Sequence, residues 1–180
     1  HDACYGNMAE NTLPDHVAAL EQLAQTRPFM DISRVGIYGH SGGGFATAAA
    51  LFNYPEFFKV GVSSSGNHDN RNYEDDWGER YNGLESDVDY AAQANQVNAK
   101  NLEGKLLIMH GGMDDNVPPY NTYLVVDALI KANKDFDLII YPNARHGYGT
   151  DSLYQIRRTW DYFVKHLRGE TPPKEYKLSW

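Results

Sequence analysis

Short apolar runs alternate with helical periods along the chain. Continuous apolar runs of this length are typical of strands buried in a parallel sheet, and they occupy residues 34–39, 60–63, 105–110 and 137–141. Apolar residues recur at helical spacing in residues 17–24, 45–52, 120–131 and 152–167. Strands that alternate with helices predict an α/β fold, with a mostly parallel sheet and helices on both of its faces.

The segments between these elements differ in character. Residues 11–15 combine a capping side chain with an early proline and an early acid, which predicts a helix start there. Residues 66–90 are polar, acidic and aromatic without a clear period, so we expect a long excursion between two strands. The tail after Gly169 contains two prolines and two lysines, and it is expected to be a surface extension. We find no internal repeat and no second domain.

Composition is that of an ordinary globular domain. The 180 residues are 42% hydrophobic, which is enough for one hydrophobic core. The formal net charge of −8 argues against a nucleic-acid partner, because phosphate binding needs a basic surface. No apolar run approaches the roughly 20 residues that span a bilayer, so we expect no membrane partner for this segment. The single cysteine, Cys4, excludes an internal disulfide. We also expect no metal ion and no cofactor.

A Gly-x-Ser-x-Gly pattern lies at residues 39–43, between a predicted strand and a predicted helix. This pattern is typical of a nucleophile elbow, a sharp turn that has no room for bulky neighbours around its serine. The hydroxyl of Ser41 would stand at the carboxyl end of a strand, above a helix N-terminus whose free amides favour developing negative charge. A glycine-rich turn that binds a phosphate, or nothing, is the alternative that the pattern alone leaves open.

The next two predicted strands both end in candidate partners for this serine. Residues 110–118 contain a pair of aspartates, and residues 142–147 contain His146. Open α/β sheets build their sites at this edge, and the order Ser, Asp, His along the chain is that of the α/β-hydrolases. The histidine would take the proton of Ser41, and an aspartate would hold the imidazole tautomer and stabilise its positive charge. His40 and His110 flank the site, where packing or hydrogen bonding is the commoner role.

These motifs resemble the prolyl oligopeptidase family, and within it the dipeptidyl-peptidase-IV branch. The resemblance rests on Gly-His-Ser-Gly-Gly at residues 39–43, His-Gly-Gly-Met-Asp-Asp-Asn-Val at residues 110–117 and His-Gly at residues 146–147. It covers the chain from about residue 15 to about residue 167. It implies an α/β-hydrolase fold with Ser41 as nucleophile, His146 as general acid and base, and Asp114 rather than Asp115 as the orienting acid. The amide of Gly42 would be one oxyanion donor.

The resemblance also implies a substrate pocket. Residues 73–81 are similar to the aromatic segment of the family that ends in Glu-Arg-Tyr, and Tyr73 and Trp77 would line a pocket for a proline-sized side chain. Asn116 would hold a substrate carbonyl, and Val117 would form a wall of the pocket. Ordinary packing beneath a loop is the alternative for the two aromatic residues. The chain departs from the branch at Gly42, where a tyrosine is usual, and at Asn70, where a tryptophan is expected.

The resemblance further indicates what the 180 residues would be. We expect residues 1–180 to form a partial catalytic domain, truncated at its N-terminal side, without the upstream strands and the propeller domain of the family. Such a fragment is expected to be a weak catalyst or inactive. Its expected setting is a bacterial protein of the periplasm or the cytoplasm, a choice that the sequence leaves open.

The function expected on these grounds is that of a serine peptidase that releases N-terminal dipeptides of the X-Pro or X-Ala type through an acyl-enzyme. Its partner would be a peptide substrate. An acylaminoacyl peptidase, a carboxylesterase or an acetyl esterase is the enzymatic alternative, because the fold does not determine the acyl group. A non-catalytic α/β module that forms a homodimer through an exposed sheet edge is the alternative from another class.

Overall fold

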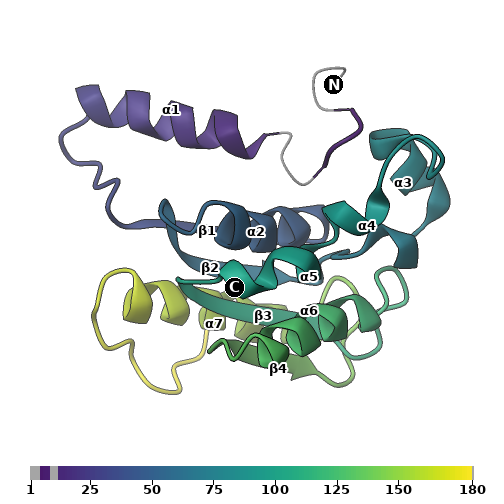
Figure 1. Cartoon of the computed structure of the whole chain (residues 1–180). Helices are drawn as coiled ribbons and strands as arrows, with labels where there is room; N and C mark the ends of the chain where they lie inside the picture. Colours follow the sequence, from purple (N-terminus) through teal and green to yellow (C-terminus); the bar gives the residue numbers. More distant parts are fainter. Residues whose placement is uncertain (1–4, 9–11, 180) are drawn as a thin grey trace.

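The computed structural model describes residues 5–8 and 12–179 and contains one parallel sheet (Figure 1). Its strands are β1 (Val35–His40), β2 (Phe58–Ser64), β3 (Lys105–Gly111) and β4 (Asp137–Tyr141). They lie in the order β1-β2-β3-β4, and every neighbouring pair is parallel. All four strands therefore end at the same edge of the sheet, which is where the loops with the candidate residues begin.

Helices cover both faces of this sheet, as the sequence predicts. The α-helices are α1 (Leu13–Thr26), α2 (Gly42–Asn53), α3 (Asp75–Asn82), α4 (Tyr90–Gln93), α5 (Asn95–Asn98), α6 (Tyr120–Lys131) and α7 (Ser152–His166). Short 3₁₀ turns are η2 (Asn70–Asn72), η3 (Ala99–Asn101) and η4 (Gly149–Asp151). Among the described helices, none is both long and apolar enough to cross a membrane.

Alternate residues of β3 enter two separate hydrophobic cores. Leu106 and Ile108 pack with the buried residues of α2 and α6 on one face. Leu107 and Met109 pack on the other face, in the core to which α7 contributes Tyr162. Successive side chains of a strand point to opposite faces, so a strand covered on both sides must be apolar at every position. This explains the continuous apolar runs of the sequence.

The predicted boundaries agree with the observed ones where apolar residues define them. The strand at residues 137–141 and the helix at residues 120–131 have their predicted ends. Helix α2 begins at Gly42, three residues earlier than predicted, because three glycines hide the start of the helical period. At the start of α1, Thr12 is the capping residue but its side chain makes no cap hydrogen bond, which corrects that part of the prediction. Asn11 lies outside the described residues.

The segment at residues 66–90 belongs to a long excursion between β2 and β3, as expected, but it contains helical elements that its lack of a clear period does not indicate. It contains the 3₁₀ turn η2 and the helix α3, and α4 begins at its end. Helix α3 has two acids, Asp75 and Asp76, in its first turn and Arg80 in its last, which stabilises it through the helix dipole. A helix of eight residues with this many charges buries only a narrow stripe, so it has no apolar period to detect.

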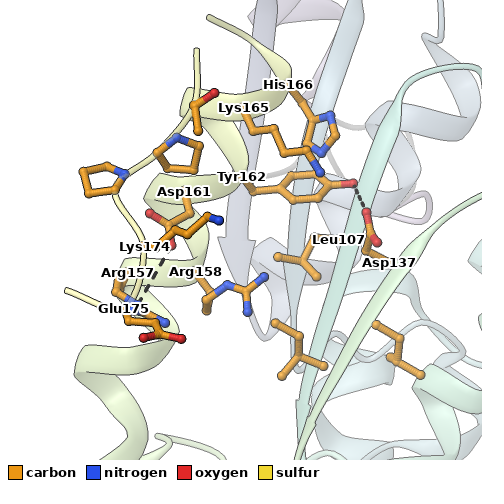
Figure 2. Close-up of a pocket in the computed structure, with 15 residues that line it drawn as sticks. Leu107, Asp137, Arg157, Arg158, Asp161, Tyr162, Lys165, His166, Lys174 and Glu175 are labelled. Carbon is orange, nitrogen blue, oxygen red and sulfur yellow. Dashed lines mark hydrogen bonds and ion pairs between the residues drawn. The ribbon is translucent and has the colours of Figure 1, made fainter. Parts of the chain in front are cut away.

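The tail lies on the surface, as expected, and it runs back along α7 (Figure 2). Arg157 Nη1 donates to the carbonyl oxygen of Tyr176 at 3.0 Å, and the Tyr176 hydroxyl donates to Asp161 at 3.1 Å. The Arg157 guanidinium also lies 4.8 Å from the ring centre of Tyr154. A cavity of about 570 Å³ lies between the tail, α7 and β4, on the side of the sheet away from α2.

Candidate active site

Ser41 occupies the turn between β1 and α2 in a backbone conformation that a serine rarely adopts. Its φ is 59° and its ψ is −124°, a left-handed geometry that costs a non-glycine residue on the order of 1–3 kcal/mol. Its N–H donates to the carbonyl oxygen of Ser64 at 2.8 Å, and its own carbonyl accepts from the N–H of Phe45 at 3.0 Å. Hydrogen bonds on both sides therefore hold the turn in this strained geometry.

Two positions near Ser41 have no room for a side chain, so glycine is required at both. A Cβ on Gly39 would collide with the backbone of Gly43, and a Cβ on Gly44 would collide with the carbonyl oxygen of Ser64. A Cβ on Gly43 would meet no atom of the described residues within 4 Å, apart from the backbone of its own helix. The N–H of Gly42, in the first turn of α2, has no acceptor within the helix and is free to bind an anion.

Asp114 and His146 form a hydrogen bond across the ends of β3 and β4. His146 Nδ1 lies 2.8 Å from Asp114 Oδ2. The other carboxylate oxygen of Asp114 accepts from the backbone N–H groups of Asn116 at 3.0 Å and Val117 at 2.9 Å. Because an ionised carboxylate accepts only, His146 donates through Nδ1 and its Nε2 is left to accept a proton. The neighbouring Asp115 pairs with Arg145 instead, so Asp114 is the aspartate that faces the histidine.

His110 supports Asp114 from within the core. Its side chain is fully buried, and Nε2 lies 3.0 Å from the carbonyl oxygen of Val117 and 3.3 Å from Asp114 Oδ2. Nδ1 lies 2.7 Å from Thr122 Oγ1. Since a carbonyl only accepts, the proton is on Nε2 and Thr122 donates to Nδ1. Burial lowers the pKa of His110, which keeps it neutral beside the carboxylate.

Ser41 and His146 lie at the same edge of the sheet without direct bonding. Among the described residues no hydrogen bond joins the Ser41 hydroxyl to His146, a looseness that is common in sites without substrate. His40, which directly precedes Ser41, lies with its ring centre 4.5 Å from that of His146. Partial burial and the neighbouring His146 both lower the pKa of His40, so His40 is neutral at pH 7.

A chain of hydroxyl groups lies behind these two histidines. The Tyr148 hydroxyl lies 2.7 Å from Ser64 Oγ and 3.0 Å from Ser65 Oγ, and Ser64 Oγ lies 3.3 Å from His40 Nδ1. All three hydroxyl-bearing residues are buried, and burial raises the pKa of Tyr148. The sequence did not predict this series of hydrogen-bonded hydroxyl groups. The signal that could have indicated it is the polar residues in an apolar setting, because serines end β2 and a tyrosine follows the His-Gly pair.

Three aromatic side chains form a row beside the elbow. Tyr73 and Trp77 lie edge to face with ring centres 5.3 Å apart, and the ring centre of Tyr81 lies 5.0 Å from that of Trp77. A Cβ on Gly42 would lie 3.6 Å from the indole ring of Trp77, which places the indole against the turn. The Tyr73 hydroxyl donates to Asn116 Oδ1 at 3.0 Å, and burial raises the pKa of Tyr73. The structure thus brings three of the predicted pocket residues together near Ser41.

Val117 differs from its predicted place in the pocket wall. It is fully buried, so its side chain offers no surface to a substrate. Its backbone N–H donates to Asp114 and its carbonyl accepts from His110. The loop must turn inward here to hold Asp114, and this turn buries the Val117 side chain.

Asn70, at the position where the resemblance expects a tryptophan, is buried, and its Oδ1 accepts from Asn67 Nδ2 at 2.6 Å.

A parallel sheet with helices on both faces, and a strained serine between a strand and a helix, define an α/β-hydrolase fold. Residues 1–170 match the sequence model of the prolyl oligopeptidase family, and the chain belongs to that family.

Individual relatives agree with this assignment. The chain is 34% identical over 159 residues to dipeptidyl peptidase family member 1 of Caenorhabditis elegans, which covers 86% of this chain and 19% of the relative. It is 31% identical over 165 residues to human dipeptidyl peptidase 8, covering 89% of this chain and 18% of the relative. The crystal structure of Porphyromonas gingivalis dipeptidyl peptidase 4 superposes with a TM-score of 0.80 and 31% identity, covering 92% of this chain and 24% of that one. The chain therefore spans about a fifth of the length of the curated relatives that it matches.

Proposed function

We propose that this chain is the catalytic part of a serine peptidase that releases N-terminal dipeptides, with Ser41, His146 and Asp114 as its triad. The observation that carries the proposal is the 2.8 Å hydrogen bond between Asp114 and His146, at the edge of the sheet where Ser41 stands in its strained turn. A buried carboxylate with two backbone donors is a stable partner for an imidazolium, which the reaction must form.

The reaction would proceed through an ester of Ser41. His146 Nε2 takes the proton of the Ser41 hydroxyl as its oxygen bonds to the substrate carbonyl carbon, and the N–H of Gly42 stabilises the negative charge on the carbonyl oxygen. His146 then gives this proton to the leaving amine as the C–N bond breaks. Water attacks the ester in the second half and loses a proton to His146, which gives it to Ser41 Oγ as the C–O bond to Ser41 breaks and the dipeptide acid leaves.

The aromatic row supports a preference for a small apolar ring. The indole of Trp77 lies close to Gly42 and the ring of Tyr73 packs against it, which suits a proline or alanine side chain next to the bond that is cut. Tyr73 donates to Oδ1 of Asn116, and this orients the amide so that its NH₂ group is available for a substrate carbonyl. The relatives described above are named dipeptidyl peptidases, in agreement with this substrate class.

The test compares free and blocked amino termini in the whole protein. We expect Gly-Pro and Ala-Pro anilides to be cleaved faster than N-succinyl derivatives of the same dipeptides, and Ser41→Ala to abolish both activities. Equal rates on blocked and free substrates would favour an acylaminoacyl peptidase, and turnover of acetyl esters alone would favour an esterase. Absence of labelling of Ser41 by a fluorophosphonate, together with a dimer in gel filtration, would favour the non-catalytic module.

We expect the 180-residue chain by itself to be a weak catalyst. Gly42 is the one oxyanion donor that we assign in it, and loss of a single donor typically lowers the rate by about 100- to 1,000-fold. The measurement is the turnover number of the chain and of the whole protein on one dipeptide anilide. Comparable values would show that no further donor is needed.

A further inference from the structure

The loop that carries His146 has an attachment that the proposed triad does not use. Tyr148, two residues after the histidine, is a non-glycine residue in the left-handed region, with φ 61° and ψ −15°. This conformation costs on the order of 1 kcal/mol or more and persists only where the surroundings hold it. The ring of Tyr148 is buried, lies edge to face with Tyr141 at 4.9 Å between ring centres, and has its hydroxyl between two serine hydroxyls.

These hydroxyls form a single directed chain. Each carries one proton, so Tyr148 donates to one serine and accepts from the other. When Nδ1 of the neutral His40 carries no proton, Ser65 can donate to Tyr148, Tyr148 to Ser64, and Ser64 to His40 Nδ1. When Nδ1 carries the proton, each of these hydrogen bonds is reversed. In either direction every link has one donor and one acceptor. The chain connects the loop of β4 to the end of β2 and then to the residue before Ser41.

We infer that Tyr148 is a positioning residue for the general base, one that sets the place of His146 relative to Ser41 through its hydroxyl. This inference rests on the proposed function. Asp114 holds one edge of the imidazole at Nδ1, and His40 lies against its ring. A hydrogen bond at Nδ1 leaves the ring free to swing about that bond if its loop moves. Attachment of the loop to β2, which ends beside the elbow, limits this movement and so fixes the position of Nε2 relative to Ser41.

Tyr148→Phe tests the inference by removing one oxygen atom and no ring contact. We expect kcat of the whole protein to fall about 10-fold or more with KM nearly unchanged, because small displacements of a catalytic group are costly. Labelling of Ser41 by a fluorophosphonate should slow by a similar factor. Hydrogen exchange in residues 145–149 should become faster while that of α2 stays the same.

Tyr141→Phe is the matched control, since it removes the same atom from a buried tyrosine whose hydroxyl, within the described part of the chain, donates to Met109 Sδ at 3.4 Å and to no other side chain. Kinetic constants of this variant should stay within about twofold of the wild-type values. Ser64→Ala combined with Tyr148→Phe should cost no more than Tyr148→Phe alone, because both changes break one chain.

Two results would overturn the inference. One is that Tyr148→Phe keeps the wild-type kcat, labelling rate and loop exchange. The other is that Tyr148→Phe and Tyr141→Phe lower kcat equally, which would assign the effect to packing. If the wild-type protein itself is not labelled at Ser41, the proposed function fails instead, and the exchange of the loop still measures whether the Tyr148 hydroxyl holds it.

Discussion

Arg145 pairs with Asp115, while the next residue, His146, pairs with the preceding aspartate, Asp114. The two loops are therefore joined by two adjacent pairs of different character. The first pair is exposed, whereas the Asp114 side chain is fully buried and that of His146 is 23% exposed. An exposed pair contributes little to stability because water and salt screen it. Only the buried pair has the desolvated, directed hydrogen bond that the proposed triad mechanism requires.

This difference predicts opposite results for two neighbouring substitutions. Asp114→Asn should lower kcat by about 10⁴-fold, because an amide NH₂ cannot accept the proton of His146 Nδ1 and favours the wrong tautomer. Asp115→Asn, the matched control, should change kcat by less than about threefold. The measurement is anilide turnover of the whole protein, with fluorophosphonate labelling as a second readout. Equal losses in the two variants would contradict the assignment of Asp114.

Adjacent glycines of α2 should respond with opposite sign to alanine. Gly43→Ala places a methyl group in open space inside a helix, which should raise the free energy of unfolding by up to about 1 kcal/mol. Gly44→Ala forces a methyl group onto the carbonyl of Ser64 and should lower it by about 2 kcal/mol or more. Urea denaturation measures both. A stabilised Gly44→Ala variant would show that α2 can move away from β2 at no cost.

Stability should fall in acid because of a buried histidine behind the site. Burial lowers the pKa of His68 to about 3, and its Nδ1 accepts from Asn95 at 2.9 Å. In the unfolded chain His68 takes up a proton near pH 6.5, whereas in the folded protein it stays neutral. Its contribution to the free energy of unfolding is therefore fully present above pH 6.5 and is lost as pH falls toward 3. From pH 8 to pH 5 the loss from this one group is about 2 kcal/mol.

Denaturant titrations at several pH values would measure this loss. His68→Gln should be less stable than the wild type at pH 7 but should lose less stability between pH 6.5 and pH 5. His110 has a pKa lowered in the same direction by burial, so part of the acid dependence should remain. His16→Gln, on the exposed surface of α1, controls for the general effect of replacing a histidine with glutamine. An identical slope for His68→Gln and the wild type would refute the prediction.

Trp77→Ala separates a pocket role from a packing role. If the indole contacts substrate, KM for a Gly-Pro anilide should rise about 10-fold while the free energy of unfolding falls by about 1 kcal/mol, since the side chain is only half-buried. Trp160→Ala, on the exposed face of α7, should leave KM unchanged. A large loss of stability with an unchanged KM would identify Trp77 as a packing residue beneath the loop.

Apolar periodicity accounts for what the sequence could predict of the fold. The four strands and the helix at residues 120–131 have their expected places because burial on both faces of the sheet demands continuous apolar runs. Helix α3 was not predictable in this way, since charges at its ends and a narrow buried stripe stabilise it.

The candidate site was predictable in part. The loops of the Ser41, Asp114 and His146 motifs follow parallel strands, and such loops must meet at one edge. The choice of Asp114 over Asp115 needed the family resemblance, because both aspartates occupy the same loop. Tyr148 and Ser64 are 84 residues apart, and only the folded chain shows that their hydroxyls meet.

The register of the sheet limits which changes of length the protein can accept. Ser64 pairs with His40 in β1 and with Met109 in β3, so the loops after these strands begin at nearly the same register position along the sheet. One residue inserted within β1 would move Ser41 by about 3.3 Å along the strand and turn each following side chain to the opposite face. An insertion between α3 and α4 would alter no strand. Among homologous chains, gains and losses of residues should therefore gather in the segment around residues 83–89, and each of the four strands should keep its own length.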